Sequence, residues 1–106
     1  MTAPQAVTLE RAIGRVVEGT RHWSPARWSS GGKAEAMHEL VQTLADLCAE
    51  AEGEPRREVP RLPNDLHLPE QLQVIGLDLL DVADRLTPSQ TAAAHTAIEK
   101  ARTVLF

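Results

Sequence analysis

The chain has 106 residues, with 15 acidic and 11 basic side chains and a formal net charge of −4. Its length fits one domain, residues 1–106, which can bury a core without disulfides or a structural metal. The acidic balance lacks the basic surplus with which nucleic-acid-binding domains neutralise phosphates, so we expect no nucleic-acid partner.

A first helix is predicted over residues 3–19. Thr2 and Gln5 have the spacing of a capping box, which satisfies free backbone N–H groups at a helix start. Gly19 is a typical helix stop. The apolar residues recur at helical spacing and predict one buried face: Leu9, Ala12, Ile13, Val16 and Val17.

Residues 20–32 show no helical periodicity. They include Pro25, two glycines and both tryptophans of the chain. Proline and glycine interrupt regular structure, so we interpret this segment as a long loop rich in tryptophan and arginine.

A second helix is predicted over residues 33–52, with Ser29 or Ser30 as its cap and Gly53 as its stop. Its apolar face comprises Met37, Leu40, Val41, Leu44, Leu47, Cys48 and Ala51. The opposite face is acidic and comprises Glu35, Glu39, Asp46 and Glu50.

Residues 54–68 contain three prolines, which remove backbone donors and disfavour helix. They predict an extended, proline-rich connection.

A third helix is expected over residues 69–86. Its inner seam comprises Leu72, Ile75, Leu79, Val82 and Leu86. Three further apolar residues, Val74, Leu77 and Leu80, fall on its other side.

A fourth helix is predicted over residues 88–104, because Thr87 and Gln90 form a second capping-box pattern around Pro88. Its inner face comprises Ala94, Ala97, Ile98, Ala101, Val104 and Leu105. The tight turn before it predicts an antiparallel hairpin with the third helix. The four elements together predict an all-α fold, a small four-helix bundle.

The segment from Arg21 to Trp28 concentrates residue types that are enriched at binding hot spots. We expect a partner protein to contact Arg21, His22, Trp23, Arg27 and Trp28. A guanidinium over an indole face would add a cation–π interaction. In the alternative interpretation, the tryptophans close one end of the bundle and fill gaps that alanine and leucine leave.

Two other surfaces are candidates for binding. Ser29, Ser30 and Lys33 surround two glycines at a helix start, which favours an anion. The second apolar side of the third helix, formed by Val74, Leu77 and Leu80, predicts a homodimer interface. The alternative is that the 54–68 connection folds over that side.

Catalytic signatures are not recognisable in the sequence, and we predict no catalytic residue, no metal ligand and no cofactor. Glu35 and His38 have the spacing of one di-metal half-site, but such centres require two copies. The alternative is a magnesium-dependent phosphohydrolase that uses the acidic residues Glu35, Asp78 and Asp81 of the second and third helices.

The single cysteine, Cys48, cannot form an internal disulfide, so the fold does not depend on an oxidising compartment. The first residues lack the charged and apolar regions of a signal peptide, and no apolar stretch approaches the ~20 residues that span a bilayer. We therefore expect a cytoplasmic protein without a membrane partner, which acts as a non-enzymatic protein–protein interaction or regulatory module through residues 21–33.

Overall fold

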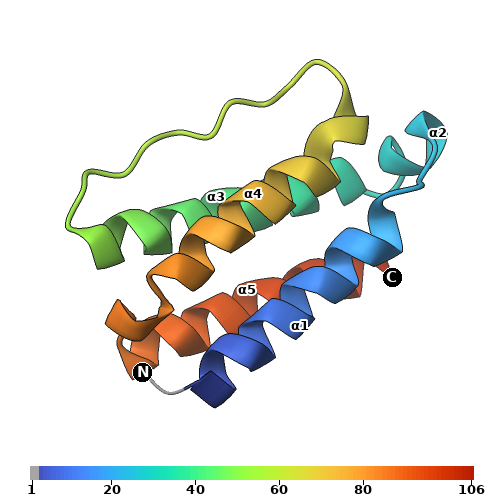
Figure 1. Cartoon of the computed structure of the whole chain (residues 1–106). Helices are drawn as coiled ribbons and strands as arrows, with labels where there is room; N and C mark the ends of the chain where they lie inside the picture. The colour runs from blue at the N-terminus through green and yellow to red at the C-terminus, as the bar shows by residue number, and fades with distance from the viewer. Residues whose placement is uncertain (1–2) are drawn as a thin grey trace.

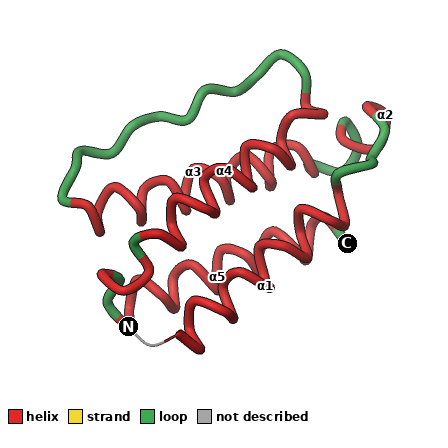
Figure 2. Tube along the Cα trace, in the orientation of Figure 1, coloured by secondary structure: helices red, strands yellow, loops and turns green. Residues whose placement is uncertain are grey.

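The computed structural model describes residues 3–106, and their side chains from residue 8 onward. Within this range the chain forms helices joined by turns and loops and contains no strand, which confirms the all-α class (Figure 2). The helices are α1 (Ala3–Thr20), α2 (Pro25–Trp28), α3 (Lys33–Glu52), α4 (Leu68–Asp81) and α5 (Pro88–Leu105). Two short 3₁₀ turns, η1 (Asp65–His67) and η2 (Ala83–Arg85), flank α4.

The four long helices pack in a ring in which α4 contacts α1 and α3, and α5 also contacts α1 and α3. Figure 1 shows that α3 and α4 run in the same direction, opposite to α1 and α5. The chain must therefore return along the length of α3 before α4 can begin, and residues 54–64 make that return. The predicted hairpin is correct in direction but wrong in contact, because α4 and α5 pack chiefly on α1 and α3.

The connection of residues 54–64 is fixed to α3 by side chains that bind its backbone. Gln42 donates to the carbonyl oxygen of Arg57 at 3.0 Å and accepts from the backbone N–H of Val59 at 2.8 Å. His38 Nε2 lies 3.0 Å from the carbonyl oxygen of Val59. These contacts hold the extended segment in place without strand pairing, because the side chains of Gln42 and His38 bind backbone groups that hydrogen bonds within a sheet would otherwise satisfy.

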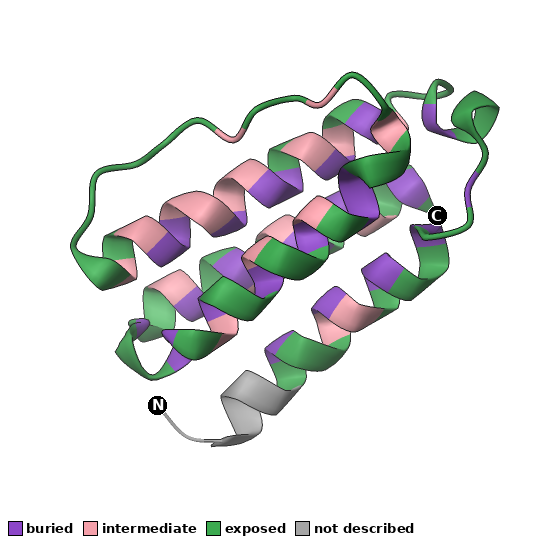
Figure 3. Cartoon of the chain, turned by 45° about the horizontal axis from the view of Figure 1, so that its top comes forward, coloured by how far each residue is buried: buried purple, intermediate pink, exposed green. Residues whose placement is uncertain are grey.

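The core lies between the four long helices and is built from the apolar stripes that the sequence predicts (Figure 3). On the long helices the buried stripe residues recur at helical spacing, as expected when a helix buries one face. Val82 and Leu86 of the third predicted stripe are also buried, but they lie beyond the end of α4. One assignment is wrong: of the two adjacent residues Val104 and Leu105, both predicted on the inner face of α5, Leu105 is buried and Val104 is 40% exposed, because neighbouring helical residues point about 100° apart.

Several local expectations differ from the structure. The segment of residues 20–32 contains the helical turn α2, in which Ser24 Oγ accepts from the backbone N–H of Arg27 at 3.2 Å. The N-cap of α3 is Gly32, with φ of 71°, rather than Ser29 or Ser30. The third long helix ends at Asp81, earlier than predicted, because the chain tightens into η2.

The start of α5 follows the sequence pattern closely. Gln90 donates its backbone N–H to Thr87 Oγ1 at 3.1 Å, and its side chain accepts from the backbone N–H of Thr87 at 2.9 Å. The capping box is therefore confirmed there. The one predicted at Thr2 and Gln5 lies outside the residues whose side chains are described. None of the described helices is long and apolar enough to cross a membrane.

Candidate functional site

The two tryptophans of the loop close one end of the core. Trp28 is 1% exposed and Trp23 is 8% exposed. Their ring centroids lie 4.8 Å apart at 55°, and Phe106 meets Trp23 edge-on with centroids 5.8 Å apart. Both geometries are favourable for aromatic pairs. We call these three residues the aromatic cluster; Figure 1 shows α2 at the same end of the bundle as the chain end that carries Phe106. The alternative interpretation of the tryptophans, as an end closure, fits this placement.

Arg27 lies on the outside of the aromatic cluster. Its guanidinium carbon is 4.3 Å from the centroid of the Trp23 ring. Within the described residues no carboxylate pairs with Arg27, whereas Arg21 donates to Glu18 at 2.7 Å. A guanidinium stacked on a ring keeps its in-plane N–H donors available, and the ring limits the side chain's freedom. Arg27 is thus an ordered cation with unused donors.

The exposed residues at this end include two arginines and a histidine. Arg21, His22 and Arg27 are all exposed, and Phe106 is 58% exposed although its ring contacts Trp23. We call these four residues the α2 surface. Sequence reasoning missed Phe106, because a single aromatic far along the chain carries no local signal that it returns to residues 21–28. Gly19 gave a partial signal: a Cβ there would lie 2.8 Å from the Phe106 ring, so glycine makes room for it.

The residues expected to bind an anion are engaged locally. Ser29 Oγ donates to the carbonyl oxygen of Ala26 and Ser30 Oγ to that of Arg27, each at 3.0 Å. The Lys33 ammonium lies beside Gly31, at 3.2 Å from the position of a Cβ built there. The two hydroxyl protons are therefore already bound by backbone carbonyls, and anion binding at these residues stays a prediction.

The second apolar side of α4 is partly open. Val74 and Leu77 are each 58% exposed, while Leu80 is partly buried against the core. The connection of residues 54–64 runs along one edge of α4, where Val59 and Leu62 line a hollow together with Val74 and Ile75. The connection therefore reaches the side of Val74, but it leaves both Val74 and Leu77 more than half exposed. Self-association through this side stays a prediction.

The acidic residues of the enzyme alternative do not gather. Glu35 lies exposed on α3, and Asp78 and Asp81 lie exposed on α4. In the described part of the chain no three histidine, cysteine or acidic side chains are placed to hold one metal ion. Mg²⁺ requires oxygen ligands that converge on one point. The geometry gives no specific support to this alternative.

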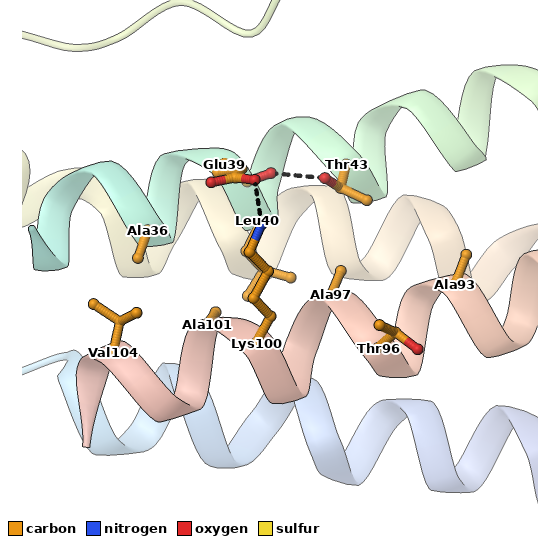
Figure 4. A pocket seen from close by; sticks show the side chains of 10 residues that line it. All are labelled: Ala36, Glu39, Leu40, Thr43, Ala93, Thr96, Ala97, Lys100, Ala101 and Val104. Carbon is orange, nitrogen blue, oxygen red and sulfur yellow. Dashed lines mark hydrogen bonds and ion pairs between the residues drawn. The ribbon is translucent and has the colours of Figure 1, made fainter.

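A shallow hollow of about 320 Å³ lies between α3 and α5 (Figure 4). Its floor is made of alanines and Leu40, and an ion pair between Lys100 Nζ and Glu39 Oε1 at 3.1 Å spans its middle. The lining residues are Ala36, Glu39, Leu40, Thr43, Ala93, Thr96, Ala97, Lys100, Ala101 and Val104. The hollow exists because the facing positions of α3 and α5 carry small side chains. Its two charged residues, Glu39 and Lys100, pair with each other.

Burial raises the pKa of Cys48 from 9.0 to about 12, and Glu52, which accepts from its Sγ at 3.2 Å, contributes further. At pH 8 the thiolate fraction in the folded protein should be roughly a thousandfold lower than in the unfolded chain. We expect iodoacetamide to label the native protein far more slowly than the urea-unfolded protein, as mass spectrometry can measure. Equal rates would contradict the burial of this thiol.

The same shift gives a pH dependence of stability. Because the folded protein holds the Cys48 proton more tightly, its contribution to stability is complete below about pH 9 and is lost as the pH rises towards about 12. In a Cys48→Ala variant, the stability should fall less steeply than in the parent as the pH rises from about 9 towards about 12.

Comparison with protein-family models, with curated proteins and with solved structures found no match to this chain. The candidate sites therefore stand on their geometry alone. The α2 surface is the one in which an ordered cation with unused donors, an exposed aromatic ring and a rigid support occur together.

Proposed function

We propose that this chain is a four-helix bundle that acts as a non-enzymatic protein–protein interaction module, and that the α2 surface binds an acidic segment of a partner protein. The observation that carries the proposal is the position of Arg27, held 4.3 Å above the Trp23 ring with no carboxylate partner in the described residues. Aromatic and arginine side chains are the types that dominate binding energy at interfaces.

The buried tryptophans support this role indirectly. Trp28 and Trp23 fill the end of the core, and the Trp23 ring lies beneath the Arg27 guanidinium. A side chain that is ordered before binding loses less conformational entropy on association. The partner would therefore contact Arg27, His22 and Phe106, and the tryptophans would act as their support.

The acidic character of the partner follows from charge. Arg27 presents a planar set of N–H donors that matches a carboxylate in two parallel hydrogen bonds. Lys33 likewise has no ion pair in the described part of the chain and adds positive charge nearby. An acidic partner segment that also carries an apolar residue would satisfy both Arg27 and Phe106.

Intrinsic tryptophan fluorescence tests the proposal, because both tryptophans of the chain belong to the aromatic cluster. A short glutamate-rich peptide should change the emission saturably, and added salt should weaken its binding. A lysine-rich peptide of the same length should leave the emission unchanged. The proposal fails if neither peptide changes the emission, or if both peptides bind with equal affinity.

Arg27→Gln should weaken binding of the glutamate-rich peptide at least about tenfold, because it removes the charged partner of the carboxylate. Arg85→Gln is the matched control, because Arg85 is exposed on η2 and makes no ion pair in the described residues. Circular dichroism should be the same for both variants and the parent. Equal affinities of the two variants would remove the basis of the proposal.

A further inference from the structure

The outer face of α4 is apolar at its centre. Val74 and Leu77 lie one helical turn apart and are each 58% exposed. Beside Leu77, a hollow of about 150 Å³ runs between α1 and α4. Its apolar lining comprises Ile13, Gly14, Val17, Gly76, Leu77 and Leu80. Leu77 therefore forms one wall of a groove rather than an isolated exposed side chain.

Two glycines shape this groove. Gly76 brings α4 against α1, since a Cβ there would lie 2.9 Å from Ile13 Cγ2. A Cβ at Gly14 would meet nothing within 4 Å, so the space above it is empty. On the other edge of α4, Gln71 donates to the carbonyl oxygen of Pro60 at 3.1 Å and ties the connection to that edge. The groove has the form into which a ridge of helical side chains can pack.

Acidic side chains surround the apolar centre. Asp78 and Asp81 share the outer face of α4 with Val74 and Leu77, following the three- and four-residue spacing of a helix. Glu10 lines the groove from α1. Within the described residues, none of these three carboxylates makes an ion pair, whereas Glu18 at the end of the groove is paired with Arg21. The rim thus carries uncompensated negative charge.

We propose that this face, the α4 groove, binds an amphipathic helix of another protein whose apolar stripe is flanked by lysine or arginine. Leu77 and Val74 would pack against the stripe, and Glu10, Asp78 and Asp81 would pair with the basic flanks. Binding of a helix in a groove by apolar anchors is a common mode of recognition, and opposite charge supplies specificity.

The same charges disfavour a second copy of this chain as the occupant. A two-fold interface brings the same patch of both subunits together. Packing α4 on α4 would place the carboxylates of Asp78 and Asp81 near those of the other copy, with no basic group on the outer face of α4 to separate them. Like charges at an interface are unfavourable, so the homodimer expected from the sequence is the less favourable use of this face.

The probe is a synthetic amphipathic helix of leucine and lysine with a fluorescent label, and its binding is followed by anisotropy. It should bind saturably, while the same peptide with glutamate in place of lysine should not bind. Leu77→Ser should weaken binding about tenfold, as expected for an apolar anchor. Asp78→Asn combined with Asp81→Asn should weaken it several-fold and flatten its dependence on salt.

Matched controls keep the test specific. Val104→Ser removes an exposed apolar side chain on α5, and Glu35→Gln removes an exposed acid on α3; both should change affinity by less than about twofold. Equal losses in the control variants, or tight binding of the glutamate peptide, would overturn the proposal. It would also be overturned if light scattering showed a dimer that Leu77→Ser dissociates, because a second copy would then cover the groove.

Discussion

Replacing Trp28 with alanine should lower the free energy of unfolding by about 3–5 kcal/mol, the usual cost of removing a buried large aromatic side chain. Trp28 is 1% exposed and contacts Trp23, whose ring in turn supports Arg27 and Phe106. The substitution leaves a cavity at the end of the core. Urea denaturation followed by far-ultraviolet circular dichroism measures the change, and a loss below about 1 kcal/mol would contradict the burial of this ring.

Trp28→Phe is the matched control. Trp28 Nε1 is buried and has no hydrogen-bond partner in the described structure, so phenylalanine removes an unsatisfied donor while keeping most of the apolar area. We expect a clearly smaller loss than for alanine. This result matters for the function, because an alanine at Trp28 would impair partner binding through unfolding, whereas Arg27→Gln tests binding in a folded protein.

Replacing Gly76 with valine should destabilise the fold by about 3 kcal/mol. A Cβ at this position would lie 2.9 Å from Ile13 Cγ2, closer than carbon atoms approach, and Ile13 is buried and cannot move aside freely. Overfilling a packed contact typically costs about 1–3 kcal/mol, and valine adds two methyl groups beyond the Cβ. Thermal unfolding should show the loss, and an unchanged melting temperature would mean that α1 and α4 do not meet here.

Two further variants separate overfilling from a general effect on helices. Gly14→Ala, on the facing helix, should raise stability by about 0.5–1 kcal/mol, because its Cβ meets nothing within 4 Å and alanine favours helix. In an Ile13→Ala background, Gly76→Val should cost less than in the parent, since the clashing side chain is gone. Additive effects of the two changes would contradict direct contact between these residues.

Much of the fold could be predicted from local patterns. The stripe of Leu40, Val41 and Leu44 on α3 lies in the core as its spacing predicts, and Thr87 and Gln90 form the capping box that their spacing predicts. Both signals involve residues within a few positions of one another. Helical periodicity and capping chemistry act over one or two turns, so a single sequence carries them directly.

The arrangement of the candidate sites could not be predicted in the same way. Phe106 contacts Trp23 although the two residues are far apart in the sequence, and no pattern near either residue encodes that contact. The path of the 54–64 connection depends on Gln42 and His38, and nothing in the sequence distinguishes these two from other polar residues of α3. The helical turn of α2 did have a signal, because Ser24 followed by Pro25 is a typical helix start.

We propose that one small fold carries two binding surfaces of opposite charge, the α2 surface and the α4 groove. Amide NMR spectra of the parent protein, recorded with the glutamate-rich peptide and then with the leucine–lysine helix, test it directly. The first peptide should shift signals centred on residues 22–28, and the second should shift signals centred on residues 74–81 and 10–17. The proposal would be contradicted if both peptides shifted the signals of the same residues, or if neither peptide shifted any signals.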